Sequence, residues 1–139
     1  MALVSTKGMY GLSALYEIYL SNSLKPIQSR DIAQKANIPQ TYLEQILLIL
    51  KKEKFVKSTR GVHGGYMLNI DANSIKIKDV FLALEKNLNI VETKTGNSVL
   101  DKFYDEYTKQ LHQLLDLSLS ELHHKYKQKR TISYTTFGL

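Results

Sequence analysis

The sequence predicts a mainly α-helical fold with a small β-hairpin wing, in which a winged helix-turn-helix domain is followed by a long C-terminal helix. Three observations predict this fold class. Residues 29–53 hold two short amphipathic patterns joined by a tight break, residues 55–70 hold two strand-like runs around a glycine-rich turn, and residues 98–128 carry one long apolar stripe. A helix pair followed by a two-stranded hairpin is the plan of a winged helix.

The composition is that of one soluble domain with an extension. The chain has 139 residues, of which 43% are hydrophobic and 23% are charged, and these values are ordinary for a globular protein. Neither a membrane-length apolar run nor a signal peptide is visible, so we expect no membrane partner and a cytoplasmic location. The absence of cysteine excludes disulfides, thiolate zinc sites, cysteine nucleophiles and cysteine-ligated iron–sulfur clusters.

The net charge of +6 is concentrated in one half of the chain. Residues 1–70 contain nine Lys/Arg and four Asp/Glu, whereas residues 71–139 contain ten and nine. A basic excess confined to one region favours a polyanionic partner. A solvated basic face without any partner is the alternative, which charge alone does not exclude.

The first helix is expected over residues 8–21. Apolar groups recur there at Met9, Leu12, Leu15, Tyr16 and Tyr19, a spacing typical of a helix buried along one side. Ser5 and Thr6 lie just upstream and are suitable capping residues.

The helix pair is expected next, with Ser29 as the N-cap of a helix that runs through Ala36. Asn37 enters the left-handed region at low cost and can make the sharp turn, while Pro39 suits the start of a second helix. That helix is predicted over Gln40–Glu53. Its apolar stripe is Leu43, Ile46, Leu47 and Leu50, its exposed start is polar, and Lys51, Lys52 and Lys54 gather at its end. Such a pair indicates a helix-turn-helix, although helix pairs also occur in proteins that bind no DNA.

The wing is expected from strands at residues 55–59 and 66–70. Gly61, Gly64 and Gly65 between them permit a turn that requires positive φ. Arg60 and His63 lie at the tip, where a side chain can enter a minor groove. An ordinary hairpin with a solvated arginine is the alternative.

After a short helix at 77–85 and a polar connector, one long helix is expected from Ser98 to Gln128. At 1.5 Å per residue it would be about 45 Å long, more than a small domain covers. An apolar stripe that outlasts its own domain favours a partner helix, most simply in a homodimer; the alternative is a helix folded back on its own chain. The expected dimerisation residues are Leu100, Phe103, Tyr107, Leu111, Leu114, Leu115 and Leu122. The tail at 131–139 could pair as an edge strand, dock on a partner or stay disordered.

Four segments together resemble the Rrf-type (Rrf-two) family of winged helix-turn-helix regulators: STKGMYGLSAL, DIAQKANIPQTYLEQIL, LKKEKFVKSTRGVHGGYML and IKIKDVFLALE. The resemblance runs from Val4 to Glu92. It implies a dimeric bacterial transcription factor, with a repressor role, that binds a palindromic operator in double-stranded DNA. It also implies a DNA-binding domain at 1–86, a connector at 87–97 and a dimerisation helix at 98–130.

The resemblance further implies which residues meet DNA. The second helix of the pair would enter the major groove, where Thr41 and Glu44 face base edges, and Arg60 would enter an adjacent minor groove. Phosphate contacts are implied for Ser5, Lys7, Ser29 and Arg30, and nearby contacts for Gln40 and Tyr42. By their positions on the helix face, at its basic end and on the wing tip, Gln45, Lys52 and His63 are further DNA-binding candidates. The recognition helix of this family often begins with serine, and Pro39 occupies that place here, so a contact from that serine is not expected.

The connector departs from cluster-binding members, which carry three cysteines there. Here it reads NLNIVETKTGNSVLDK, so the chain resembles the clusterless branch and no cofactor is expected. Control would then come from a small molecule or a protein co-regulator, acting at the connector or in a cavity beneath the dimer helices.

Two further interpretations remain open. His63, His112, His123 and His124 are either solvated surface residues or, across a dimer axis, metal ligands. An enzyme is not expected, because no nucleophile elbow, P-loop or HExxH pattern is present. A protein-interaction module that uses the long helix and has no specific operator is the alternative function.

Overall fold

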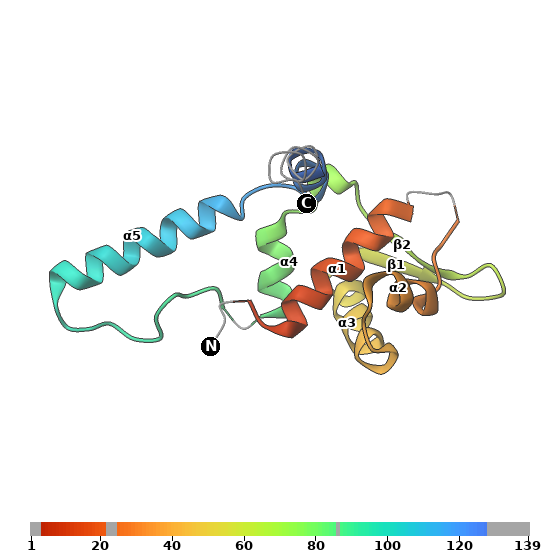
Figure 1. Cartoon of the computed structure of the whole chain (residues 1–139), viewed down its shortest axis with the longest axis horizontal. Coiled ribbons are helices and arrows are strands. Elements are labelled where there is room, and N and C mark those ends of the chain that lie inside the picture. The colour runs from red at the N-terminus through yellow and green to blue at the C-terminus, as the bar shows by residue number, and fades with distance from the viewer. Residues whose placement is uncertain (1–3, 22–24, 86, 128–139) are drawn as a thin grey trace, which may run out of the picture.

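The computed structural model describes residues 4–21, 25–85 and 87–127, and within them the predicted fold class is confirmed (Figure 1). Helical structure resumes at residue 119 and continues to 127, the last described residue. The predicted tail at 131–139 lies outside the described residues. The labelled elements are α1 (Thr6–Ser21), α2 (Ser29–Ala36), α3 (Gln40–Lys52), β1 (Val56–Thr59), β2 (Gly65–Leu68), the 3-10 turn η1 (Ala72–Ser74), α4 (Ile77–Leu84) and α5 (Ser98–Leu114).

Helix α1 is present, and most of its predicted apolar face packs on the core: Leu15 is buried, and Leu12, Tyr16 and Tyr19 are partly buried against it. The prediction is wrong for Met9, and the buried face also includes small residues that were not predicted. Its buried residues are Gly8, Gly11, Ala14, Leu15 and Ile18, whereas Met9 is 54% exposed. The physical reason is the close approach of α4, since a Cβ at Gly11 would overlap the Leu84 side chain. The predicted Ser5 cap is confirmed, because the Ser5 Oγ accepts a hydrogen bond from the Gly8 N–H at 3.3 Å.

The helix pair agrees with its predicted boundaries to within a residue. Asn37 adopts φ 56° and ψ 51°, and its N–H donates to the Ala33 carbonyl, which ends α2 in the predicted left-handed turn. Ile38 is 5% exposed and fills the corner. The predicted N-cap is wrong by one position. Gln28 precedes the helix without a side-chain cap, and Ser29 is its first residue.

The wing is an antiparallel hairpin whose register pairs Val56 with Leu68 and Thr59 with Gly65. Gly61 and Gly65 have the expected positive φ, but Gly64 does not. Glycine is required at position 64 for a different reason, because a Cβ there would overlap the Thr59 carbonyl. At Gly65, the hairpin meets the segment before α2, where backbone bonds join Ile27 and Tyr66 in both directions at 2.8 and 2.9 Å.

Helix α4 packs against α1 and α3 and completes the core. Its predicted inward residues Ile77, Val80, Phe81 and Leu84 are all buried. The largest fully buried side chains elsewhere in the winged helix are Leu15, Ile18, Ile32, Leu43, Ile46, Leu47, Leu50, Val56 and Ile75. The core therefore lies among α1 to α4, with the hairpin at its edge.

The predicted uninterrupted helix over 98–128 is wrong, because α5 ends at Leu114. Residues 115–118 turn back onto the start of α4, where the Ile77 N–H donates to the Leu117 carbonyl at 2.9 Å and the Lys78 N–H donates to the Leu115 carbonyl at 3.1 Å. These bonds satisfy amides that the start of α4 would otherwise leave unpaired. The long apolar periodicity thus continues across a break in the helix.

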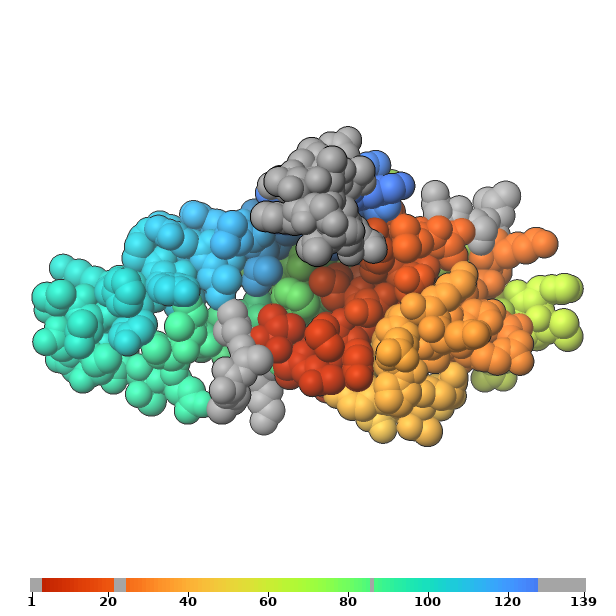
Figure 2. Space-filling model, in the orientation of Figure 1, coloured from red at the N-terminus to blue at the C-terminus, as the bar shows by residue number. Residues whose placement is uncertain are grey.

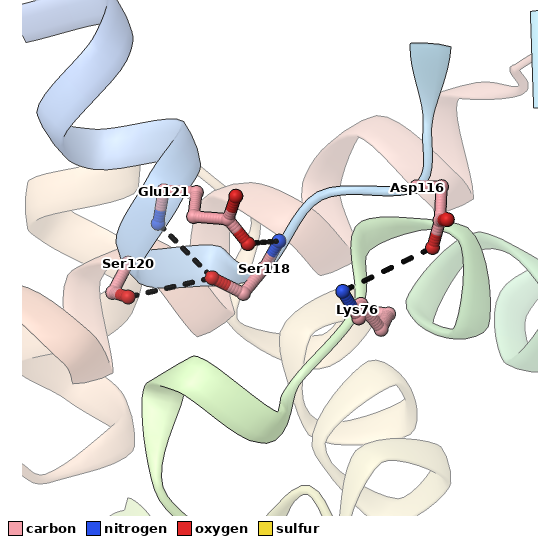
Figure 3. Close-up of polar contacts among 5 residues, drawn as sticks. All are labelled: Lys76, Asp116, Ser118, Ser120 and Glu121. Carbon is pink, nitrogen blue, oxygen red and sulfur yellow. Dashed lines mark hydrogen bonds and ion pairs between the residues drawn. The ribbon is translucent and has the colours of Figure 1, made fainter. Parts of the chain in front are cut away.

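A capping box starts the C-terminal helix after this break (Figure 3). The Glu121 N–H donates to the Ser118 Oγ, and the Ser118 N–H donates to the Glu121 Oε1, each at 3.1 Å. Lys76 and Asp116 lie 3.9 Å apart across the same junction. The reciprocal bonds of a capping box fix a helix start, so the segment 115–121 ties α5 to α4.

Helix α5 extends away from the winged helix, on the side opposite the wing (Figures 1 and 2). None of its residues is buried. Asn97 caps it, with a side chain that accepts from the Val99 and Leu100 N–H groups. Over the described ranges, no helix has the length and apolarity needed to cross a membrane.

Candidate nucleic-acid interface

The outer face of α3 is polar at the start of the helix. The inner face of the same helix is buried in the core. Thr41, Glu44 and Gln45 are exposed, while the stripe that includes Leu43 and Ile46 is buried. The outer face continues at Leu48, which is 65% exposed and was absent from the predicted site. Its position seven residues after Thr41 is the signal that places it on this face.

Gln40 joins the beginnings of α2 and α3. Its Nε2 donates to the Ser29 Oγ at 3.1 Å and approaches the Glu44 Oε1 at 3.5 Å. The structure therefore brings the predicted residues Ser29, Gln40 and Glu44 together on one surface. Ser29 acts here as an acceptor between the two helices.

Tyr42 is set apart from the exposed residues of this face by its packing. It is half-buried against the core, and its ring meets that of Tyr10 edge to face with 5.5 Å between centroids. Such aromatic pairs favour this geometry. Tyr42 thus connects α3 to α1 through its ring.

The wing tip is exposed and is linked to the start of α2. Arg60 and His63 are exposed, and Val62 between them is 85% exposed. The Gln28 Nε2 donates to the Val62 carbonyl at 3.3 Å, and Arg30 donates to the Gln28 Oε1 at 3.1 Å. Gln28, which sequence reasoning missed, therefore holds Arg30 beside the wing.

A cationic segment follows the outer face of α3. Lys51, Lys52, Lys54 and Lys57 are all exposed, and within the described part of the chain none of them forms an ion pair. Lysines at the last turn of a helix also suit its dipole. These side chains are available to an anionic partner.

The start of α1 is arranged differently from the rest of the predicted site. Both the N–H and the Oγ of Ser5 donate to the Glu85 Oε1 at 2.7 Å. The hydrogen-bond donors of Ser5 are therefore already bonded to a carboxylate. Lys7 is half-buried in the next turn. A carboxylate at this position disfavours a phosphate on Ser5.

The predicted dimerisation residues fall into two groups. Leu115 and Leu122 pack against the core of their own chain, so the break at 115–118 removes them from the exposed stripe. Within α5, Leu111 is half-buried and the others are exposed, namely Leu100, Phe103, Tyr107 and Leu114.

Two predicted surface histidines are engaged by the fold. The His112 Nε2 lies 3.1 Å from the Leu88 carbonyl, and the His123 Nδ1 lies 2.7 Å from the Tyr16 hydroxyl. The expectation that both are solvated is therefore wrong. In the described part of the chain, no three His, Cys, Asp or Glu side chains converge in a way that could hold a metal ion.

Comparison with known proteins gives consistent matches. Residues 4–128 match the family described as Rrf2, an iron-dependent transcriptional regulator. The protein named rrf2 from Nitratidesulfovibrio vulgaris is 39% identical over 94 residues, which are 68% of this chain and 63% of that protein. The regulator CymR of Bacillus subtilis is 37% identical over 89 residues, which are 64% of each chain. The matched part thus spans less than two thirds of these relatives.

Solved structures extend the likeness beyond the winged helix. The structure of B. subtilis CymR, described as the global cysteine regulator, superposes with a TM-score of 0.82 at 29% identity, over 90% of this chain and 98% of that one. The structure of T. potens IscR superposes with a TM-score of 0.77 at 30% identity, over 91% and 89%.

Proposed function

We propose that this chain, which belongs to the Rrf2 family of transcriptional regulators, is a sequence-specific regulator that binds double-stranded DNA as a homodimer. The observation that carries this proposal is the joined surface made by the outer face of α3, the start of α2 and the wing. Gln40 and Gln28 bond across these elements, so the surface is held as one unit. Its rim is cationic and its centre is polar, as expected of a surface that reads a duplex.

In this proposal the start of α3 lies in the major groove. Glu44 suits a cytosine amino group as an acceptor, and Thr41 suits either a donor or an acceptor on a base edge. Leu48 adds an apolar group that can contact a thymine methyl. Base readout is thus assigned to exposed residues that follow one another along one face of a single helix.

The surrounding cations are assigned to the phosphate backbone. Lys52 and its neighbours at the end of α3 and Arg30 at the start of α2 neutralise phosphates, which supplies sequence-independent affinity. Arg60 is assigned to the minor groove beside the site, where narrow A·T-rich sequence attracts arginine.

The dimer is proposed to form through α5. Its exposed apolar residues include Phe103 and Tyr107. These side chains become buried only if another surface covers them, and a second copy of the same helix is the simplest such surface. We accordingly divide the chain into a reading domain at 1–86, a connector at 87–97 and a dimerisation helix at 98–114, in place of 98–130. Two reading domains related by a dyad require a palindromic operator.

The donor set does not fit the iron that the family description names. The chain has no cysteine, and its described residues bring together no three potential ligands. We therefore propose a regulator, with repression as its mode, whose signal is a small molecule or a protein rather than a cysteine-bound cluster. Its relatives are regulators and not enzymes, and we assign no catalytic role.

Binding of the purified chain to genomic fragments tests this function. We expect one set of fragments to be retained far better than random DNA between about 50 and 200 mM salt, with affinity falling as salt rises. A chain that binds every fragment as weakly as random DNA would instead favour the alternative, an interaction module that uses the exposed α5.

A further inference from the structure

The start of α1 is closed by a carboxylate from the end of α4. Glu85 directly follows α4, and its Oε1 accepts hydrogen bonds from the Ser5 N–H and the Ser5 Oγ, each 2.7 Å long. Gly8, in the first turn of α1, leaves the space for this group, because a Cβ there would overlap the Glu85 Oε1. The contact therefore fastens the end of α4 to the start of α1, across 80 positions of the chain.

The same end of α1 lies beside the reading surface. The ring of Tyr10, in the second turn of α1, packs on Tyr42 at the start of α3 with 5.5 Å between centroids, and Figure 1 shows the first turns of α1 next to α3. The N–H groups at the start of a helix favour an anion. In the proposed complex, a duplex whose major groove holds α3 therefore presents a flanking phosphate to Ser5.

Glu85 carries a negative charge that no cation offsets. The residue is half-buried, and across residues 4–21, 25–85 and 87–127 it forms no ion pair. A carboxylate and a phosphate cannot both accept the hydrogen bonds of Ser5, and two like charges a few ångströms apart repel each other. Glu85 and a DNA phosphate therefore compete for the start of α1.

Glu85 also stands at the beginning of the connector. Leu88, three positions further on, is 1% exposed, and its carbonyl accepts a hydrogen bond from the His112 Nε2 of α5 at 3.1 Å. The connector is thus held to α5 close to the point where it leaves α4. A rearrangement of the connector or of α5 is transmitted to the segment that carries Glu85.

We propose that the contact between Glu85 and Ser5 is autoinhibitory, in that it keeps the start of α1 closed to a DNA phosphate until the connector moves. The inference rests on the regulatory function proposed above and assigns a route to its control input. A signal that displaces the connector withdraws the Glu85 carboxylate, and the N–H and Oγ of Ser5 then donate to a phosphate. Release of this contact raises the affinity for DNA.

Fluorescence anisotropy with labelled duplexes compares the wild type with Glu85→Gln. The glutamine keeps an acceptor oxygen for Ser5, which preserves the fold, but a neutral amide yields to a phosphate more readily than a carboxylate does. The probes are a genomic fragment that the wild type retains and a random duplex of equal length. We expect binding about fivefold tighter for each subunit near 150 mM salt, and a salt slope steeper by about one unit for each subunit. The gain should be equal on both duplexes, because a phosphate contact carries no sequence information.

Glu92→Gln is the matched control, because it removes the same charge from an exposed position in the connector. It should leave both affinities unchanged, and an equal gain in the two variants would show an effect of net charge alone and overturn the proposal. Adding Ser5→Ala to Glu85→Gln should remove part of the gain, since the phosphate then loses the hydroxyl donor. A gain that persists in full in the double variant would refute the assigned competition at Ser5.

A purely structural cap is the rival role of Glu85. In that case Glu85→Gln lowers the free energy of unfolding in urea but leaves DNA affinity and salt slope unchanged, and the proposal fails. The wild type separates this outcome from failure of the regulatory function. A wild type that binds the genomic fragment and the random duplex alike contradicts the function, while the random duplex still reports the effect of Glu85. A wild type that discriminates between them, beside an unchanged Glu85→Gln, overturns this inference alone.

Discussion

Gly65→Ala should destabilise the protein because the hairpin at this point touches the segment that leads into α2. Gly65 has φ +145°, and a Cβ there would lie 2.5 Å from the Ile27 carbonyl oxygen and 2.6 Å from its carbon. The side chain must push β2 away from the segment at Ile27. The two backbone bonds between Ile27 and Tyr66 are then lost or lengthened. At about 0.5–1.5 kcal/mol for each bond, together with about 1–3 kcal/mol of backbone strain, we expect a loss of roughly 2–6 kcal/mol.

Gly61→Ala is the matched control. Gly61 also has a positive φ, of +107°, but a Cβ there would meet no atom within 4 Å. It should therefore cost only the backbone strain, about 1–3 kcal/mol. Urea denaturation followed by circular dichroism measures both free energies of unfolding. If the two variants are destabilised equally, the contact between the hairpin and the α2 leader contributes nothing, and our account of how the wing is positioned is wrong.

Four further predictions address the reading surface, the junction and the dimer. Arg60→Ala should weaken DNA binding and relax the preference at one A·T-rich position in a binding selection; an equal loss on every sequence would make Arg60 a phosphate contact. Lys52→Ala should lower the salt slope of binding by about one unit with the sequence preference unchanged, and an unchanged slope would remove Lys52 from the interface. Ser118→Ala should lower the free energy of unfolding by about 1 kcal/mol through loss of the cap, and unaltered urea denaturation would dismiss the capping box as a stabilising element. Phe103→Glu should give a monomer in sedimentation and weaken DNA binding, whereas a persistent dimer would place the interface away from α5.

The helix pair was predictable because its signals are local. Asn37 can enter the left-handed region whatever surrounds it, and it does so here. Pro39 favours a helix start nearby, and it is the residue that directly precedes α3. The hairpin was predictable for the same reason at Gly61 and Gly65. The link from Arg30 through Gln28 to Val62 was not, because it depends on a contact between residues 34 positions apart.

The errors have a common cause. The spacing of apolar residues shows that a helix has an apolar face, but it does not show which part of the molecule that face packs against. The apolar stripe continues through Leu115 and Leu122, but these residues face the core of their own chain because backbone bonds to α4 end the helix before them. The S-x-x-E pattern at Ser118 was the local sign of a new helix start. In α1, small residues are buried because Leu84 approaches Gly11, and only the folded arrangement shows this.

Selection of bound genomic fragments, followed by footprinting, shows whether the protein reads an operator as a dimer. If two reading surfaces are held by a dimer, the protected sites should contain two inverted half-sites with centres about 10 base pairs, or a multiple of this, apart. Substitution of Thr41 by alanine should alter the preferred base within each half-site and leave the spacing unchanged. Fragments without a shared motif, or a motif without inverted symmetry, would contradict the account.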